Sequence, residues 1–207
     1  MRVKICGLRE ERHVEAAIEA GASAIGLVLA PSPRQVSIAR ARALAAHAGD
    51  RVERVAVLRT FSPDAFALAA AAGCTHLQVS GARQGGSLPL VPVVHDGVDA
   101  EGELALVRTL APIVLFDAPR PGSGTLPSLE RAARLARLHP LVLAGGLDAD
   151  NVADAIAHVR PYGVDVSSGV ERAPGEKSVE RIHAFVRAAL RALDLLSAPR
   201  PEVSSCP

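Results

Sequence analysis

Aromatic residues are scarce in this 207-residue sequence: Phe, Tyr and Trp together make up 2% of it, and Trp is absent. The aromatic platforms on which proteins stack single-stranded nucleic acid are therefore hard to assemble. The sequence also lacks an excess of one charge, because 23 Lys and Arg residues face 22 Asp and Glu residues, for a net charge of +1. Without a basic footprint for a polyanion, we expect no nucleic-acid partner.

Cysteine and histidine are few and scattered. Cys6, Cys74 and Cys206 form no Cys-x-x-Cys pair, and the seven histidines never fall within four positions of one another. These spacings predict neither a disulfide framework nor a local pair of metal ligands. We therefore expect a metal-free protein of a reducing compartment, the cytoplasm.

Long apolar runs are missing as well. The longest, such as the Ala-rich stretch that ends at Cys74, fall far short of the ~20 residues that a membrane span needs, so no membrane partner is expected. A hydrophobic fraction of 49% and a charged fraction of 22% are close to the average of soluble globular domains. The length fits one large domain. We expect it to cover residues 1–196, and the Pro/Ser-rich tail, residues 197–207, to be disordered.

The sequence does contain a regular alternation. Short apolar, β-branched segments alternate with longer Ala, Leu and Arg stretches of helical period from one end to the other, which is typical of α/β folds. Strands are expected at residues 3–6, 24–29, 52–59, 76–79, 91–95, 112–117, 141–145 and 163–167. Helices are expected at residues 10–20, 38–48, 63–72, 101–110, 129–138, 151–159 and 178–196.

Eight strands in 207 residues predict a single-domain (β/α)₈ barrel, or TIM barrel, a fold that takes ~200 residues or more. Residues 80–90 show no helical pattern and residues 101–110 a weak one, so helix four is expected to be short or missing and helix five weak. A doubly wound open sheet is the alternative, but it often places a glycine fingerprint after the first strand. Here Cys6-Gly7-Leu8 follows that strand, and Gly122-Ser123-Gly124 lacks a third glycine. No nicotinamide or flavin site of that type is expected.

Two residues at predicted strand ends suit acid-base chemistry. Period-two alternation puts Lys4 and Cys6 on one face of the first strand, where the ammonium group could lower the pKa of the thiol. Asp117 ends an apolar strand, where desolvation would raise the pKa of its carboxyl and suit it to act as a general acid. The alternatives are a buried structural cysteine and an aspartate that caps a turn. We predict that Cys6 is the base and Asp117 the acid.

Other polar residues at the same strand ends are candidates for substrate binding. Arg34 lies on a loop stiffened by two prolines, where its guanidinium could clamp a carboxylate in bidentate fashion. A solvated surface position is the alternative for an arginine in this Arg-rich chain. We expect Arg34 to bind substrate together with Lys4, Gln78 and Asp165.

Glycine-rich turns follow the last two predicted strands. Gly145 and Gly146 come after strand seven, and Ser168 and Gly169 come after strand eight. These are the two loops at which (β/α)₈ barrels most often bind phosphate through backbone N–H groups. Ordinary glycine turns are the alternative, but two such turns at the expected strands favour a phosphate site.

These residues belong to a longer series of motifs that runs in order from strand one to strand eight. The motifs are Lys4-Ile5-Cys6-Gly7, Ser32-Pro33-Arg34, Leu77-Gln78-Val79-Ser80-Gly81, Leu115-Phe116-Asp117 with Pro121-Gly122-Ser123-Gly124, Leu143-Ala144-Gly145-Gly146-Leu147 with Asn151-Val152, and Asp165-Val166-Ser167-Ser168-Gly169-Val170-Glu171 with Gly175 and Lys177. The series resembles the phosphoribosylanthranilate isomerase family of tryptophan biosynthesis.

The resemblance implies a cytoplasmic (β/α)₈ barrel that isomerises N-(5′-phosphoribosyl)anthranilate to 1-(2-carboxyphenylamino)-1-deoxyribulose 5-phosphate. The reaction is an Amadori rearrangement that requires no cofactor. In such enzymes the cysteine matching Cys6 is the general base and the aspartate matching Asp117 the general acid. The arginine matching Arg34 contacts the carboxylate of the anthranilate. The expected partner is this phosphorylated small molecule, bound by a monomer or a homodimer.

The sequence departs from the family pattern at two loops. Ser80 stands where the family usually has histidine, and Pro121 takes the place of the first glycine of a double glycine. A ProFAR-type isomerase of histidine biosynthesis is an alternative function, but it would typically have a carboxylate at the end of strand one, where this chain has Cys6. A non-catalytic phosphate-binding barrel is the second alternative.

Overall fold

The computed structural model describes residues 1–119 and 124–197. Eight parallel strands pair in sequence order, and the eighth pairs with the first, so that the sheet closes into a barrel. The strands are β1 (Val3–Cys6), β2 (Ala24–Val28), β3 (Glu53–Thr60), β4 (His76–Ser80), β5 (Leu90–His95), β6 (Val114–Asp117), β7 (Leu141–Leu143) and β8 (Gly163–Val166). The predicted (β/α)₈ barrel is confirmed.

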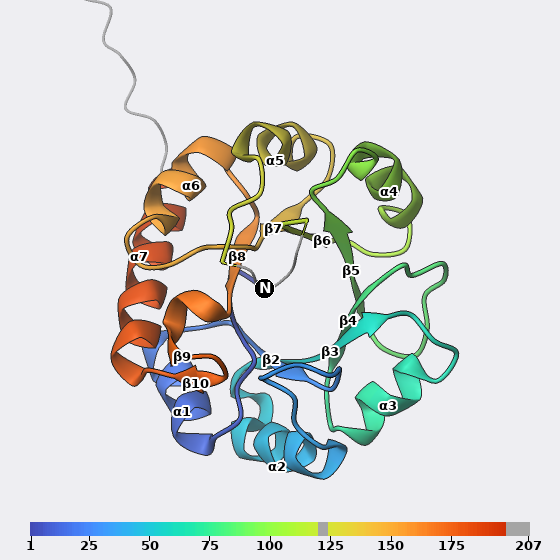
Figure 1. The fold of residues 1–207 in the computed structure, drawn as a ribbon, viewed down its shortest axis with the longest axis vertical. Helices are drawn as coiled ribbons and strands as arrows, with labels where there is room; N and C mark the ends of the chain where they lie inside the picture. The colour runs from blue at the N-terminus through green and yellow to red at the C-terminus, as the bar shows by residue number, and fades with distance from the viewer. Residues whose placement is uncertain (120–123, 198–207) are drawn as a thin grey trace, which may run out of the picture.

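Helices surround the barrel on its outer side (Figure 1). They are α1 (Glu11–Ala20), α2 (Ile38–Ala48), α3 (Ala65–Ala71), α4 (Ala100–Val107), α5 (Leu129–Ala136), α6 (Val152–Val159) and α7 (Val179–Ser197). No helix forms in the described segment between β4 and β5, as expected, because three glycines and a proline there disfavour one. The weak pattern at residues 101–110 becomes the eight-residue helix α4.

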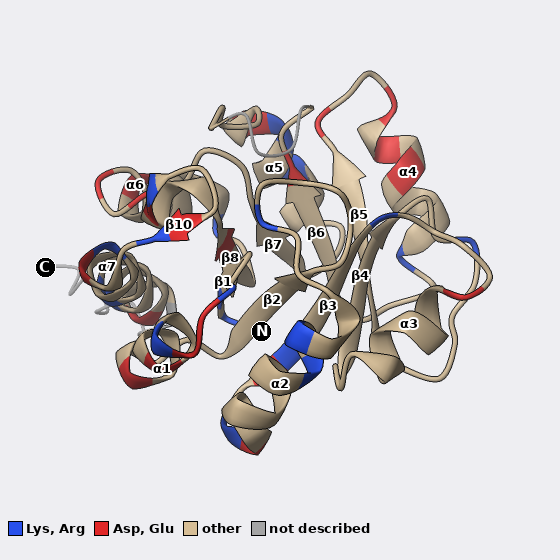
Figure 2. Ribbon diagram, turned by 60° about the horizontal axis from the view of Figure 1, so that its bottom comes forward, with Lys and Arg blue, Asp and Glu red and all other residues tan. Residues whose placement is uncertain are grey.

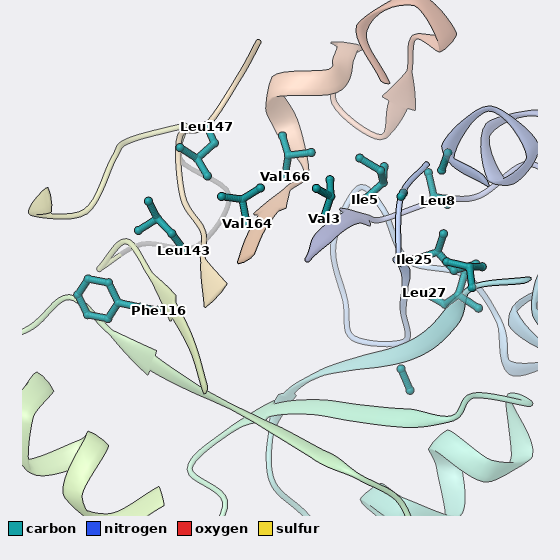
Figure 3. Close-up of a cluster of buried hydrophobic side chains, with 14 of the residues drawn as sticks. Val3, Ile5, Leu8, Ile25, Leu27, Phe116, Leu143, Leu147, Val164 and Val166 are labelled. Atoms are coloured by element: carbon teal, nitrogen blue, oxygen red, sulfur yellow. The ribbon is translucent and has the colours of Figure 1, made fainter. Parts of the chain in front are cut away.

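The core has two apolar layers, because successive strand residues face opposite sides of the sheet. One layer fills the barrel and consists mostly of Ala and Val, with Ala24, Val55, Val93, Val142 and the larger Leu115 among them. The other layer faces outward against the helices, and Figure 3 shows its side chains on β1, β2, β6, β7 and β8. Burial of each Val, Leu or Ile side chain contributes ~1.5–3 kcal/mol. The fold can therefore be stable with very few aromatic residues.

A short hairpin follows β8 that the sequence patterns did not predict. A single turn of 3₁₀ helix, Ser168–Val170, leads into β9 (Glu171–Ala173), which pairs antiparallel with β10 (Glu176–Lys177). The hairpin turn lies against the loop after β2, since a Cβ on Gly175 would come 2.4 Å from the carbonyl oxygen of Pro33. Gly175 also has a φ of +80°, which favours glycine. The hairpin thus meets the loop that carries Arg34.

Charged residues of both signs are spread over the outer helices, as Figure 2 shows, in line with the balanced composition. In the part of the chain that the structure describes, no helix is both long and apolar enough to span a membrane. The helix α7 ends at Ser197. The rest of the predicted disordered tail, residues 198–207, and Pro121, Gly122 and Ser123 lie outside the described residues.

Candidate active site

Lys4 and Cys6 lie on the inner face of β1, as their alternation predicted. The Lys4 side chain is fully buried, and its Nζ donates a hydrogen bond to Oδ1 of Asp165 on β8 at 2.7 Å. Burial opposes the charge of Lys4, yet the Asp165 carboxylate beside it raises the pKa of Lys4 above its ordinary value. The predicted binding residues Lys4 and Asp165 therefore form a buried ion pair with each other between β1 and β8.

The Cys6 thiol is buried next to this pair. Burial raises the pKa of Cys6, and the cations Lys4 and Lys177 only partly offset the effect, while Asp165 adds to it. Lys4 does act to lower the pKa of Cys6, as expected, but desolvation is the larger influence, so the pKa of the thiol lies above its ordinary value. In the free protein Cys6 is therefore a thiol at neutral pH.

Asp117 ends β6 and faces the mouth of the barrel beside His95, its register partner on β5. Desolvation raises the pKa of Asp117 to about 6, although a hydrogen bond from the Ala118 N–H to Oδ1, at 2.8 Å, opposes the shift. The predicted rise is confirmed. On the other side, a Cβ at Gly145 would lie 2.9 Å from Asp117 Oδ1, so only glycine leaves the carboxyl this space.

Arg34 reaches back from the loop after β2 to the hairpin. Its Nε and Nη2 donate to the two carboxylate oxygens of Glu171 at 2.7 and 2.9 Å. The guanidinium is thus a bidentate clamp, as its residue type suggested, but the carboxylate it holds is in this chain. Glu171 also accepts from Lys177 Nζ at 2.7 Å. Neither Glu171 nor Lys177 was among the predicted site residues.

One sequence signal could have singled out Lys177. It is one of only two lysines in an Arg-rich chain, and both lysines are buried in the structure. Lysine is rarely buried without a charged partner, so a buried lysine after an active-site strand requires a carboxylate close by. The partner Glu171 is six residues away, across a hairpin whose strands are too short to show a period.

The wall formed by β4 and β5 carries polar groups as well. Ser80 Oγ lies 2.9 Å from His95 Nε2, so the serine that stands in place of the family's usual histidine contacts a histidine of the next strand. Gln78 is buried, and its Oε1 has no hydrogen-bond partner among the described residues. These groups face the same mouth as Asp117.

A small pocket lies where β6, β7 and β8 end. Its lining includes Asp117, Gly145, Gly146 and Ser168, which brings together three of the four predicted phosphate-binding residues. The fourth, Gly169, lies behind them: a Cβ there would come 2.0 Å from the carbonyl oxygen of Leu147. Gly169 thus lets the loops after β7 and β8 pack together.

The chain is similar over most of its length to known isomerases. The family model for N-(5′-phosphoribosyl)anthranilate (PRA) isomerase matches residues 3–188. An N-(5′-phosphoribosyl)anthranilate isomerase of Afipia carboxidovorans is 42% identical over 96% of this chain and 92% of its own. One of Roseiflexus castenholzii is 38% identical over 91% of this chain and 98% of its own.

Solved structures agree with this relationship. The phosphoribosyl anthranilate isomerase of Thermus thermophilus superposes with a TM-score of 0.81 at 33% identity, covering 92% of this chain and 99% of its own. A second such isomerase, with a TM-score of 0.78 and 29% identity over the same shares of the two chains, was solved in complex with reduced 1-(o-carboxyphenylamino)-1-deoxyribulose 5-phosphate. With a family model that spans the barrel and relatives that match it nearly end to end, the chain belongs to the N-(5′-phosphoribosyl)anthranilate isomerase family.

Proposed function

We propose that this chain isomerises N-(5′-phosphoribosyl)anthranilate to 1-(2-carboxyphenylamino)-1-deoxyribulose 5-phosphate in tryptophan biosynthesis, with Cys6 as base and Asp117 as acid. Family membership supports the reaction, and one relative was solved with a reduced form of the product. The observation that carries the assignment of roles is the placement of Asp117. Its carboxyl, with a raised pKa of about 6, borders the pocket at the glycine turns proposed to hold phosphate.

Asp117 acts first. Its protonated carboxyl gives a proton to the furanose ring oxygen, the bond from that oxygen to C1′ breaks, and the nitrogen lone pair forms a protonated Schiff base. The Ala118 N–H holds Oδ1, which leaves Oδ2 to deliver the proton. General acid catalysis of this kind contributes typically ~10² to 10⁴-fold in rate.

Cys6 acts second. Its thiolate removes the proton from C2′, and the electrons of that bond form the C1′=C2′ double bond of an enolamine as the C=N⁺ bond is neutralised. Ketonisation then moves a proton from the C2′ hydroxyl to C1′ and gives the product. Both steps are proton transfers, so the proposal includes no metal or cofactor.

The two catalytic groups work in a minor protonation state. Because the pKa of Asp117 is about 6 and that of Cys6 is raised, the free protein at neutral pH mainly holds an Asp117 carboxylate and a Cys6 thiol. The reactive form has the proton on Asp117 and the charge on Cys6. The two forms contain the same number of protons, so their ratio does not change with pH. Activity should therefore be level between the two pKa values.

The remaining predicted residues bind the substrate in this proposal. Arg34 receives the anthranilate carboxylate with Nη1, since Nε and Nη2 already hold Glu171. The turns at Gly145, Gly146, Ser168 and Gly169 receive the phosphate. Asp165 lines the same pocket, the buried Lys4 supports the substrate through its ion pair with Asp165, and Gln78 completes the binding residues of the proposal. We further propose that the protein works in the cytoplasm, as a monomer or a homodimer, and without a nucleic-acid partner.

The reaction can be tested by following the fluorescence of phosphoribosylanthranilate with purified protein. We expect the signal to fall on addition of the protein, and to fall roughly 10²-fold more slowly, or more slowly still, with the Asp117→Asn variant. ProFAR, the substrate of the related histidine-pathway isomerase, serves as the comparison. Turnover of ProFAR alone would overturn the proposal in favour of that isomerase, and turnover of neither substrate would favour a binding barrel.

A further inference from the structure

Three cations and two carboxylates enclose Cys6. Lys4 pairs with Asp165 at 2.7 Å, and Lys177 and Arg34 both pair with Glu171, at 2.7 Å from Lys177 Nζ and 2.7 Å from Arg34 Nε. The side chains of Lys4 and Lys177 are 0 and 1% exposed, so water screens their charge little. The cluster has one positive charge more than its own carboxylates balance.

The extra positive charge has two possible counterions at the mouth of the barrel, the Asp117 carboxylate and the Cys6 thiolate. Buried charges are costly unless they are paired, so the site favours having one of these two groups ionised. In both protonation states of the proposed mechanism, one negative charge is present, and only its location differs. In the proposed mechanism the site therefore carries one negative charge, which catalysis must bring from Asp117 to Cys6.

Lys177 is placed to act on Cys6, one of the two groups that can carry the negative charge. Its Nζ donates to the Ser167 carbonyl oxygen at 2.8 Å, and Ser167 Oγ in turn donates to the Cys6 carbonyl oxygen at 3.1 Å. Lys177 is thus tied through one residue to the backbone of Cys6. The charged groups that influence the thiol are Lys4 on the same strand, Asp165 on β8 and Lys177 on β10, and Cys6 also interacts with Arg34 of the loop after β2. Those that influence Asp117 include Asp165, His95 and Lys4.

Glu171 keeps Lys177 charged and in place. Burial lowers the pKa of Lys177, and the hydrogen bond and the charge of Glu171 oppose that change. The same carboxylate fixes Arg34, and the hairpin turn at Gly175 packs on the Pro33 carbonyl in the Arg34 loop. The β9–β10 hairpin thus connects the proposed base and the proposed carboxylate clamp through these contacts.

We infer that Lys177, held by Glu171, is a positioning residue for Cys6: its ammonium group draws the negative charge from Asp117 to the thiol. The inference rests on the proposed function in one respect, that Cys6 is the base. The ionisation of Cys6 can nevertheless be measured without any turnover.

The test is the pH dependence of Cys6 alkylation by iodoacetamide in the free protein, with peptide mapping of the label. Lys177→Gln keeps a hydrogen-bond donor near the Ser167 carbonyl and removes the charge, and Lys177→Arg restores the charge. We expect Lys177→Gln to move the alkylation midpoint to higher pH and Lys177→Arg to recover most of the change. A midpoint that lies one pH unit higher slows alkylation about tenfold at neutral pH. A folded Lys177→Gln protein with an unchanged midpoint overturns the inference.

A second variant covers the case in which Lys177→Gln does not fold. Lys177→Met removes the charge and fills the same space without a buried polar group, and Arg34 remains as the counterion of Glu171. Its midpoint should therefore move in the same direction, and a midpoint that stays or moves down counts against the inference. In the pH profile of kcat/KM, both variants should move the alkaline limb to higher pH and lower the value of kcat/KM on the plateau. The acid limb should stay near pH 6. A shifted alkylation midpoint in a protein without isomerase activity would contradict the proposed function and leave the charge relationship standing.

Discussion

Lys4 and Asp165 join the first and last strands of the barrel. They are register partners across the seam between β1 and β8, and Lys4 Nζ lies 2.7 Å from Asp165 Oδ1 although 161 residues separate them in sequence. The pair faces the barrel interior. It links the two strands that close the sheet, and both of its charges influence the pKa of the Cys6 thiol.

Replacing Asp165 by Asn should destabilise the fold, because it leaves Lys4 buried without a counterion. Loss of one partner of a buried pair costs ~3–5 kcal/mol in the free energy of unfolding. Asp194→Asn is the matched control, since Asp194 pairs with Arg2 at 3.0 Å but is 68% exposed, and exposed pairs contribute ~0–1 kcal/mol. Urea denaturation measures both variants. Equal losses in the two would mean that the seam pair adds little.

The same pair sets an expectation for alkaline pH. The pKa of Lys4 is raised in the folded state, so the folded protein holds this proton more tightly than the unfolded chain. The stabilisation is complete below the ordinary lysine pKa of ~10.4 and is lost as the pH rises through the folded value. The loss of Lys4 pairing in Asp165→Asn should therefore lower the free energy of unfolding by the same amount at pH 6 and pH 8. This loss should become smaller only under strongly alkaline conditions.

Asp117→Asn should lower turnover by roughly 10²-fold or more, because the amide cannot donate the proton that opens the furanose ring. The pH profile of kcat/KM tests whether Asp117 is the acid. With a pKa of about 6 for Asp117, kcat/KM of the unmodified protein should rise up to about pH 6 and then level off. This limb should be missing from the residual activity of the variant.

The direction of the change in stability caused by Asp117→Asn can also be predicted. Because the folded pKa of Asp117 is raised, its contribution to stability is lost as the pH rises from the ordinary value of 3.8 to about 6. Asp117→Asn avoids the buried carboxylate, so it should be at least as stable as the parent protein at pH 7. A Tm well below that of the parent would assign Asp117 a structural role as a turn cap.

Cys6→Ser should nearly abolish turnover, because a serine hydroxyl is too weak an acid to supply a ready base. Iodoacetamide should inactivate the unmodified protein slowly at neutral pH, and a bound product analogue should slow it further. Cys74 is an internal control, since burial raises its pKa to about 12 and should leave it unlabelled. Parental turnover in the serine variant, or inactivation that follows labelling of Cys206, would falsify the assignment of Cys6 as base.

Arg34→Met should raise KM more than it lowers kcat, because a contact to the substrate carboxylate exists in both ground and transition states. A charged hydrogen bond contributes ~1.5–3 kcal/mol, which corresponds to roughly 10- to 150-fold in KM. Arg51→Met is the matched control: Arg51 forms a similar fork on Glu15, at 2.7 and 3.1 Å, on the exposed surface. An equal KM in the Arg34 variant and the parent would remove Arg34 from the binding site.

Crystals grown with inorganic phosphate should show an anion at the turns of Gly146, Ser168 and Gly169. The backbone N–H groups of such turns bind phosphate in many barrels of this type. The control is Gly146→Ala, because its Cβ would come within 2.6 Å of the Leu126 backbone nitrogen and displace the turn. Phosphate seen only at surface arginines, or bound equally by the variant, would argue against this placement.

The local patterns of the sequence determined the barrel. Eight apolar runs separated by helical stretches could be recognised because burial on both faces of a parallel strand leaves a continuous apolar run. The missing helix at residues 80–90 followed from glycine and proline alone. Asp117 was recognisable for a similar reason, since a single carboxyl at the end of an apolar strand is desolvated wherever the barrel places it, and its pKa of about 6 agrees.

Only the closed barrel decided how the charges combine. The clamp of Arg34 on Glu171 spans 137 residues, and the Lys4 and Asp165 pair spans 161, so neither could be read from spacing. The ionisation of Cys6 depends on a balance between desolvation and several charges, and Asp165 and Lys177 enter that balance only through the fold. Residue order determines periodicity and turn chemistry, whereas electrostatic interactions depend on distance and burial, which exist only after the strands have closed.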